Sequence, residues 1–136
     1  MGDEADGAVV IGVDIDEKDA QKELDKLEKQ IKKLNEALEK KQNTKSNIEA
    51  QMDDALRKAD EVNAKIRELS AQKGPDFENS KEYERLTKQS ETLIQRWGNL
   101  ETQAKNIDVD IASITKNIGE AEEQAGAYAA RIAYSQ

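Results

Sequence analysis

Three aspartates near the start of the chain, Asp14, Asp16 and Asp19, are residues of the type that binds calcium. A calcium-binding loop also needs a glycine at its sixth position and a glutamate at its end, and the sequence has neither there. Carboxylates in the first turn of a helix accept hydrogen bonds from free backbone amides and interact well with the helix dipole. We therefore interpret these aspartates as helix-capping residues.

No combination of residues in the sequence indicates catalysis. The neighbouring Glu122 and Glu123 would point in different directions on a helix, and Gly74-Pro75 has no phosphate-loop context. The chain has no histidine, which is the commonest general base, and no cysteine. We expect no catalytic residues, metal site, cofactor or small-molecule ligand, and we expect that the protein is not an enzyme.

The composition limits the kinds of partner. Of 136 residues, 37% are charged and 4% aromatic, and the net charge is −8. An acidic surface argues against binding to a nucleic-acid backbone, which requires a basic stripe. No apolar run approaches the roughly 18 residues of a transmembrane segment. We expect neither nucleic acid nor membrane as a partner of this segment.

Apolar residues recur at alternating steps of three and four along two stretches of the chain, which is the heptad pattern of coiled coils. We call these positions the seam. They are Leu24, Leu27, Ile31, Leu34, Leu38, Lys41, Lys45, Ile48, Met52, Ala55, Ala59, Val62, Ile66 and Leu69, and then Tyr83, Leu86, Ser90, Leu93, Trp97, Leu100, Ala104, Ile107, Ile111, Ile114, Ile118, Ala121, Ala125, Tyr128 and Ile132. The pattern predicts a first helix over 17–72 and a second over 80–133.

If the chain reverses near Asp76, the two seams pair throughout without a shift of register. Large residues then face small ones, such as Trp97 opposite Ala55 and Ile48 opposite Ala104, as interdigitating layers require. The predicted fold is all-α, an antiparallel two-helix coiled-coil hairpin, and we expect the protein to form oligomers. The chain ends without a helix stop signal, which suggests a segment of a longer helical protein.

The reversal is expected in a hairpin loop over 73–79. Gly74 suits a left-handed helix cap, and Pro75 cannot continue the helix. Asn79 and Glu82 have the spacing of a capping box for the second helix. Phe77 either packs the loop onto the end of the hairpin or serves as a contact point for a partner.

Lys41 and Lys45 interrupt the seam, with Asp108 and Asp110 nearby on the opposite helix. The lysines either specify the register, with their stems along the seam, or mark a place where the hairpin opens or a third helix docks.

Leu56 and Ile94 fall at positions that flank the layer of Trp97 and Ala55. They either broaden the core at this layer or, together with Trp97, form a stripe for lateral association.

The N-terminal residues have a different pattern. Residues 1–7 resemble a flexible acidic leader, and residues 8–15 read as a β-strand because β-branched side chains alternate. The alternating residues are Val9, Ile11, Val13 and Ile15. A single strand has no partner in an otherwise helical chain, so the segment is either disordered or a partner-binding strand that pairs with another chain.

The strand at Val9–Asp16, followed by Lys18–Leu27 and a long heptad helix, resembles the N-terminus of tail tape measure proteins of long-tailed phages and prophages. The resemblance implies a structural component of a phage tail that acts in tail assembly and length determination. Its partners would be other copies or other tail proteins. It would be found in the virion tail, and in the host cytoplasm during assembly. The chain lacks the long repeat region of that family, so these residues alone would not measure length.

Another class of protein fits the pattern, and a third fits it less well. A free-standing adaptor or chaperone-like hairpin would grip a protein client at its tip, through Phe77 and Tyr83. An acidic mimic of nucleic acid would need one ordered acidic face, and lysines interrupt the acids throughout.

Overall fold

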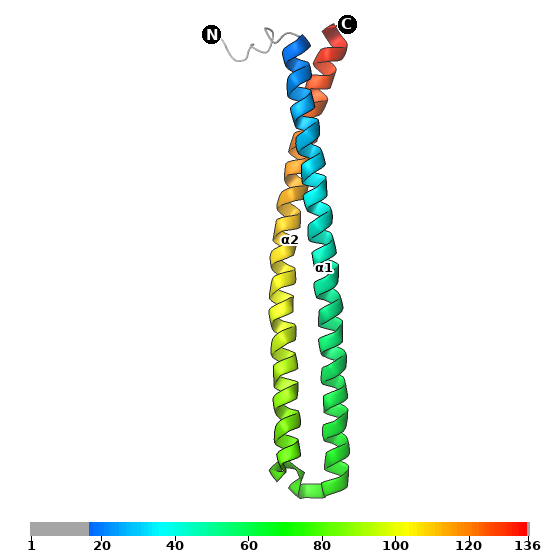
Figure 1. Cartoon of the computed structure of the whole chain (residues 1–136), viewed down its shortest axis with the longest axis vertical. Coiled ribbons are helices and arrows are strands. Elements are labelled where there is room, and N and C mark those ends of the chain that lie inside the picture. The colour runs from blue at the N-terminus through cyan, green and yellow to red at the C-terminus, as the bar shows by residue number, and fades with distance from the viewer. Residues whose placement is uncertain (1–16, 136) are drawn as a thin grey trace. The chain divides into compact units, whose positions relative to one another are not determined.

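The computed structural model describes residues 17–135 of the chain. Helix α1 spans Glu17–Lys73, a 3-10 helix, η2, spans Gly74–Asn79, and helix α2 spans Lys81–Ser135 (Figure 1). Every described residue except Ser80 is helical. The predicted all-α fold, with two helices packed against each other, is confirmed. The expected strand at 8–15 and leader at 1–7 lie outside the described residues.

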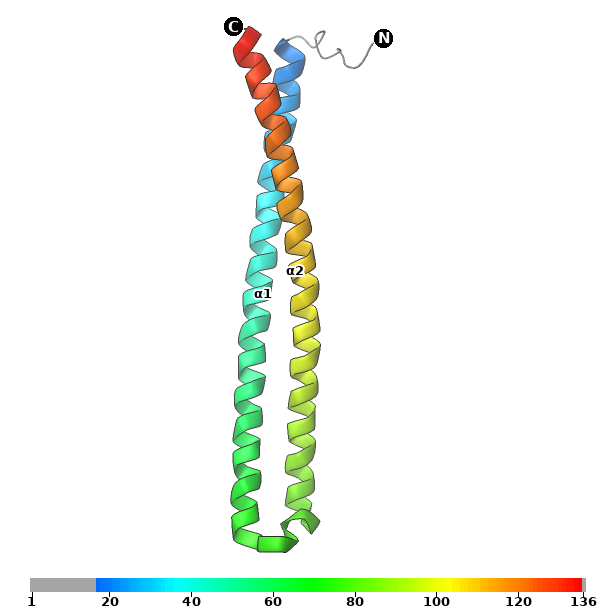
Figure 2. The same cartoon turned by 180° about the vertical axis from the view of Figure 1, so that it is seen from behind.

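The reversal is more regular than the expected loop over 73–79. Lys73 is the last residue of α1, and the six residues after it form the 3-10 helix η2. Gly74 has a φ of 67°, the left-handed conformation that the sequence predicts and that ends α1. Pro75 then lies in the first turn of η2, where its missing N–H leaves no hydrogen bond unmade. Figures 1 and 2 show the turn in green, between α1 and α2.

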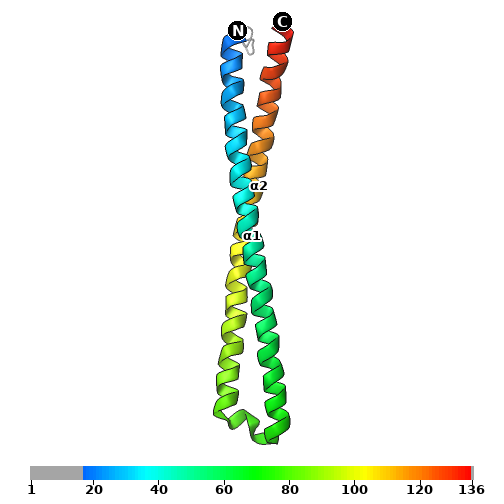
Figure 3. The same ribbon diagram turned by 45° about the vertical axis from the view of Figure 1, so that its right-hand side comes forward.

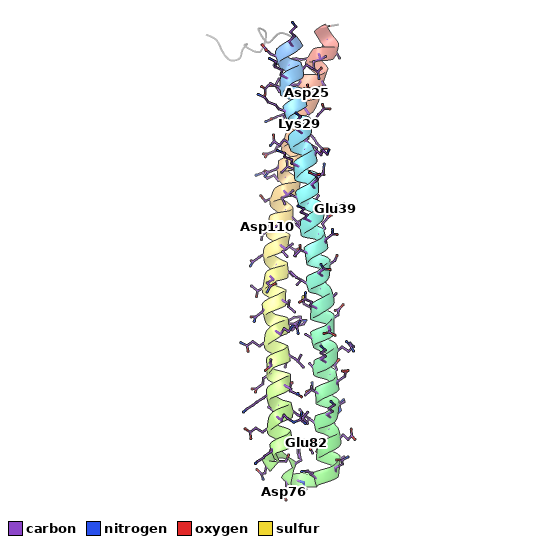
Figure 4. All side chains as sticks on the ribbon, viewed as in Figure 1. Asp25, Lys29, Glu39, Asp76, Glu82 and Asp110 are labelled. Carbon is purple, nitrogen blue, oxygen red and sulfur yellow. The ribbon has the colours of Figure 1, made fainter. Side chains whose placement is uncertain are left out.

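Helix α2 is capped by Ser80, so the expected capping box at Asn79 is wrong. The Ser80 Oγ accepts a hydrogen bond from the Tyr83 amide at 3.1 Å and donates one to the Phe77 carbonyl at 2.8 Å. Because η2 continues through Asn79, the first extended residue is Ser80, with φ −81° and ψ 150°. Figure 4 shows Asp76 in the turn and Glu82 in the first turn of α2.

The chain forms two compact units. One consists of residues 40–111, and the other of residues 17–39 together with 112–135. A pair of helices has no common centre, since each layer of side chains contacts only the layers next to it. Burial is therefore local rather than gathered in a single core.

The unit of residues 40–111 contains two apolar clusters. One is built on Ile48, Leu100 and Ile107, and the other on Val62, Leu69 and Leu86. In Figure 3 the α1 and α2 segments of this unit lie side by side on the same side of the green turn, and the chain runs along them in opposite directions. The half-buried side chains packed against the two clusters are Met52, Ala104 and Ile111 in the first, and Ile66, Phe77, Tyr83 and Leu93 in the second.

The unit of residues 17–39 and 112–135 buries fewer side chains. Its buried residues are Ala20, Leu27 and Ala121, and two of these three are alanines. In both units every predicted seam residue is buried or half-buried. The heptad pattern thus identified the inner face of both helices correctly.

Candidate interaction surfaces

The expected absence of catalytic residues stays a prediction, and the described residues are considered first for metal and membrane sites. None of their carboxylates gather in groups of three or more that could hold a metal ion. Neither α1 nor α2, over the residues described, has a stretch apolar enough to cross a membrane. Glu122 and Glu123 are both exposed.

The first surface is apolar and lies in the unit of residues 40–111. Leu56 is 47% exposed and Ile94 58% exposed, while Trp97 is half-buried. Both side chains are about half exposed, which leaves apolar area uncovered beside the layer of Trp97 and Ala55. Their heptad position is the one that flanks the seam, and in an antiparallel pair these flanking positions share one side. We call Leu56, Ile94 and Trp97 the apolar stripe.

The second feature is a polar layer in the same unit. The Lys41 Nζ lies 2.9 Å from the Asp110 Oδ2, and the Lys45 Nζ lies 2.5 Å from the Asp108 Oδ1. Figure 4 labels Asp110 on α2. Both lysine side chains are half-buried at seam positions, with their ammonium groups paired across the helices. These contacts are the ones expected of lysines that specify the register.

The polar layer also changes the pKa of one of its lysines. The hydrogen bond with Asp108 raises the pKa of Lys45 above its ordinary value, and the charges of Asp108 and Glu49 act in the same direction. The Lys45 ammonium is thus held in its charged form at this layer.

The third feature is the turn. Phe77 packs against the cluster of Val62, Leu69 and Leu86, and its ring meets Tyr83 edge to face, with centroids 5.3 Å apart and planes at 85°. Such a pair contributes roughly 1 kcal/mol beyond the burial of its area. Gly74 is half-buried and Pro75 exposed. Phe77 therefore holds the turn onto the helices, as one of the two interpretations expected.

The fourth feature is a groove in the unit of residues 40–111, which the sequence pattern did not reveal. Its volume is about 610 Å³, and we call it the basic groove. Val62 and Leu93 supply its apolar part. The charged residues that line it are Lys58, Lys65, Arg85, Lys88 and Glu61.

Charge counts along the sequence hide the basic groove, because acids and bases alternate in every block. A count by heptad position would have found part of it, since Lys58 and Lys65 are seven residues apart and lie on one side of α1. Asp54 lies beside this groove, and hydrogen bonds from Lys58 and Arg57 hold its pKa below the ordinary value.

A fifth feature lies in the other unit and has the opposite charge. A groove of about 790 Å³ is lined by Ile31 and Ala125 and by Lys32 and Asn35. Its acidic residues are Glu28, Glu36, Glu39 and Glu122. Figure 4 labels Glu39 on α1. Because the charged residues of this groove are mostly acids, it would not attract the same partner as the basic groove.

The possible partner-binding strand residues Val9, Ile11, Val13 and Ile15 lie outside the described residues. No protein-family model matches the chain, and neither the curated proteins nor the solved structures compared with it give a match.

Proposed function

We propose that this chain is a structural protein that associates with a second copy of itself through the apolar stripe. The observation that carries the proposal is the exposure of Leu56 and Ile94 on a pair of helices whose seam is already filled. Among the described residues, the only other large apolar side chains this exposed are Val109, at 68%, and Tyr134, at 93%. Leu56 and Ile94 alone share a heptad position and adjoin a half-buried tryptophan.

Association through the apolar stripe has a physical basis. Burying a whole leucine or isoleucine side chain contributes roughly 1.5–3 kcal/mol. Because Leu56 and Ile94 are about half exposed, each would contribute roughly 1 kcal/mol when covered. A two-fold interface uses the same patch twice, so four side chains would be covered and Trp97 would lie beside them.

We further propose that the assembly in which this chain works is a phage tail, as the N-terminal part of a tail tape measure protein. The support is the order of elements in the sequence, an alternating segment at Val9–Asp16 followed directly by a long heptad helix. Other copies or other tail proteins would be the partners. The chain would reside in the virion tail, and in the host cytoplasm during assembly.

Deletion of residues 1–16 in the virus or prophage that encodes this chain tests the tail assignment. We expect tails that are absent or irregular in length under the electron microscope. Tails of normal number and length after the deletion would contradict the assignment, while leaving the association through the apolar stripe untouched.

A client-binding adaptor would use the tip of the hairpin instead. Phe77 and Tyr83 are the aromatic residues available there, and they pack on each other and on the apolar cluster beneath them. Their engagement inside the hairpin favours a structural role for the turn.

A further inference from the structure

We propose that the apolar stripe of one copy of this chain docks in the basic groove of a second copy, so that the copies associate face to back rather than stripe to stripe. The inference rests on the proposed association through the apolar stripe, and it names the surface of the second copy that the stripe contacts. The residues of the basic groove that carry it are Lys58, Lys65, Arg85 and Lys88, over Val62 and Leu93.

The apolar stripe and the basic groove lie on opposite sides of the helix pair. In heptad notation, with the seam at a and d, Leu56 and Ile94 lie at position e, whereas Lys58, Lys65 and Gln89 of the groove lie at position g. In an antiparallel pair the e positions of both helices flank one side of the seam, and the g positions flank the other. The unit of residues 40–111 can therefore contact one copy through its stripe and another through its groove.

The surroundings of the apolar stripe are acidic. Residues three and four positions from Leu56 or Ile94 lie beside them on the helix surface. The charged residues at these positions are Asp53, Asp60 and Glu91, and all three are exposed. They form no ion pair with any of residues 17–135. A contact of stripe with stripe would bring the acids of two copies together, and like charges oppose such a contact.

The basic groove offers these acids partners of opposite charge. Its four bases and one acid, Glu61, give it a net charge of about +3. Lys65 of α1 and Arg85 of α2 form no ion pair with any of residues 17–135. An arginine can also bind a carboxylate with two hydrogen bonds. Charge therefore favours the contact of stripe with groove over the contact of stripe with stripe.

The spacing of the charges on α1 matches when two copies lie parallel. Asp53 and Asp60 are seven residues apart, and so are Lys58 and Lys65. A shift of five residues along α1, roughly 7.5 Å at 1.5 Å per residue, places each of these acids opposite one of the lysines.

The same shift also brings the charges of α2 together. Because α2 runs opposite to α1, the shift moves Glu91 of one copy five residues toward the N-terminus of α2, to within one residue of Arg85 in the other. On α1 it brings Leu56 to within one residue of Val62, which belongs to the apolar part of the groove. One displacement thus accounts for three charge pairs and an apolar contact.

A face-to-back contact differs from a two-fold contact in what it leaves free. The first copy keeps an open groove and the second an open stripe, so further copies add until a ring closes or a row forms. Charges at the rim of such a contact mainly select the arrangement, while the apolar area supplies the affinity.

A mixture of two blocked variants tests the arrangement. Leu56→Glu with Ile94→Glu blocks the stripe and keeps the groove, whereas Lys65→Glu with Arg85→Glu blocks the groove and keeps the stripe. At low salt we expect K65E/R85E to raise the dissociation constant of self-association at least about tenfold. We expect each variant alone to be a monomer by light scattering, and their equimolar mixture to form a dimer with one copy of each. Self-association of K65E/R85E as strong as that of the original chain, with no mixed dimer, would overturn the proposal.

The matched control changes the same number of charges outside the groove, with one substitution on each helix. K29E/K116E should keep the mass of the original chain. A loss of association equal to that of K65E/R85E would show that net charge, rather than the basic groove, governs the contact. The helical circular dichroism of every variant should equal that of the original chain.

An exchange of charges tests the pairs themselves. Adding D60K/E91K to K65E/R85E should restore self-association, because each charge pair is then present with its signs reversed. A folded quadruple variant that stays monomeric would contradict the register proposed for the contact. A monomeric original chain would instead contradict the proposed function, so the two failures are distinguishable.

Discussion

Ser80 is the residue directly before α2, and its hydroxyl contacts both sides of the junction. It accepts a hydrogen bond from the Tyr83 amide and donates one to the Phe77 carbonyl. We predict that Ser80→Ala lowers the free energy of unfolding by about 1 kcal/mol, as the loss of an N-cap does. Urea unfolding followed by circular dichroism at 222 nm measures this loss.

The matched control for Ser80 is the residue before it. Asn79→Ala should change the free energy of unfolding little, because Ser80 supplies the cap. A larger loss for Asn79→Ala than for Ser80→Ala would show that the helix begins one residue earlier than the structure has it.

Lys45 gives a prediction about pH. Because Asp108 raises the pKa of Lys45 in the folded protein, the contribution of this pair to stability is fully present below the ordinary lysine pKa. It is lost as the pH rises through the raised value. In NMR titrations of the lysine side chains, we expect Lys45 to have a midpoint above 10.5, the ordinary value.

The substitution that checks the cause is Asp108→Asn, which should return the Lys45 midpoint toward the ordinary value. Asp110→Asn removes a carboxylate of the same layer that pairs with Lys41 instead, so it should leave Lys45 as it was. Equal effects of the two substitutions would mean that Asp108 is not the specific partner.

The polar layer could be predicted from the sequence, but the cap of α2 could not. Lys41 and Lys45 interrupt a regular apolar repeat, and the antiparallel register places Asp108 and Asp110 beside them. The choice between Asn79 and Ser80 depends on how far the 3-10 turn extends. Both residues are good N-caps, and sequence spacing does not distinguish them.

At the scale of the elements, two glycines should respond to alanine in opposite directions. Gly74 has a φ of 67°, where an alanine is strained, whereas a Cβ at Gly98 within α2 would meet nothing within 4 Å. We expect Gly74→Ala to destabilise the protein by about 1 kcal/mol and Gly98→Ala to stabilise it by about 0.5–1 kcal/mol.

Thermal unfolding of the two variants beside the original chain measures both effects. A melting temperature that rises for Gly74→Ala would contradict the left-handed turn. A melting temperature that falls for Gly98→Ala would mean that another molecule covers the surface at Gly98 in solution.

The helices and their inner faces were predictable because the heptad repeat is periodic and long. A position in such a repeat is buried by geometry, whatever its partner, so even Lys41 and Ser90 were placed correctly. The outer surfaces were not predictable in the same way. The sequence could not distinguish Leu56 and Ile94 as core residues from surface residues, since they lie at the edge of the seam. The basic groove depends on side chains from both helices that no single stretch reveals.

At the scale of the whole molecule, the described residues offer an apolar surface for binding. Contact through the apolar stripe should persist at high salt, because burial of apolar area does not depend on screening.

The most direct measurement is the molar mass in solution by light scattering coupled to size exclusion, at 0.5 M salt. We predict a dimer or larger species for the full chain and a monomer for Leu56→Glu with Ile94→Glu. Val109→Glu is the matched control, since it also places a charge at an exposed apolar residue, and it should keep the mass of the original chain. A monomer for the original chain, or a mass that Leu56→Glu with Ile94→Glu leaves unchanged, would contradict association through the apolar stripe.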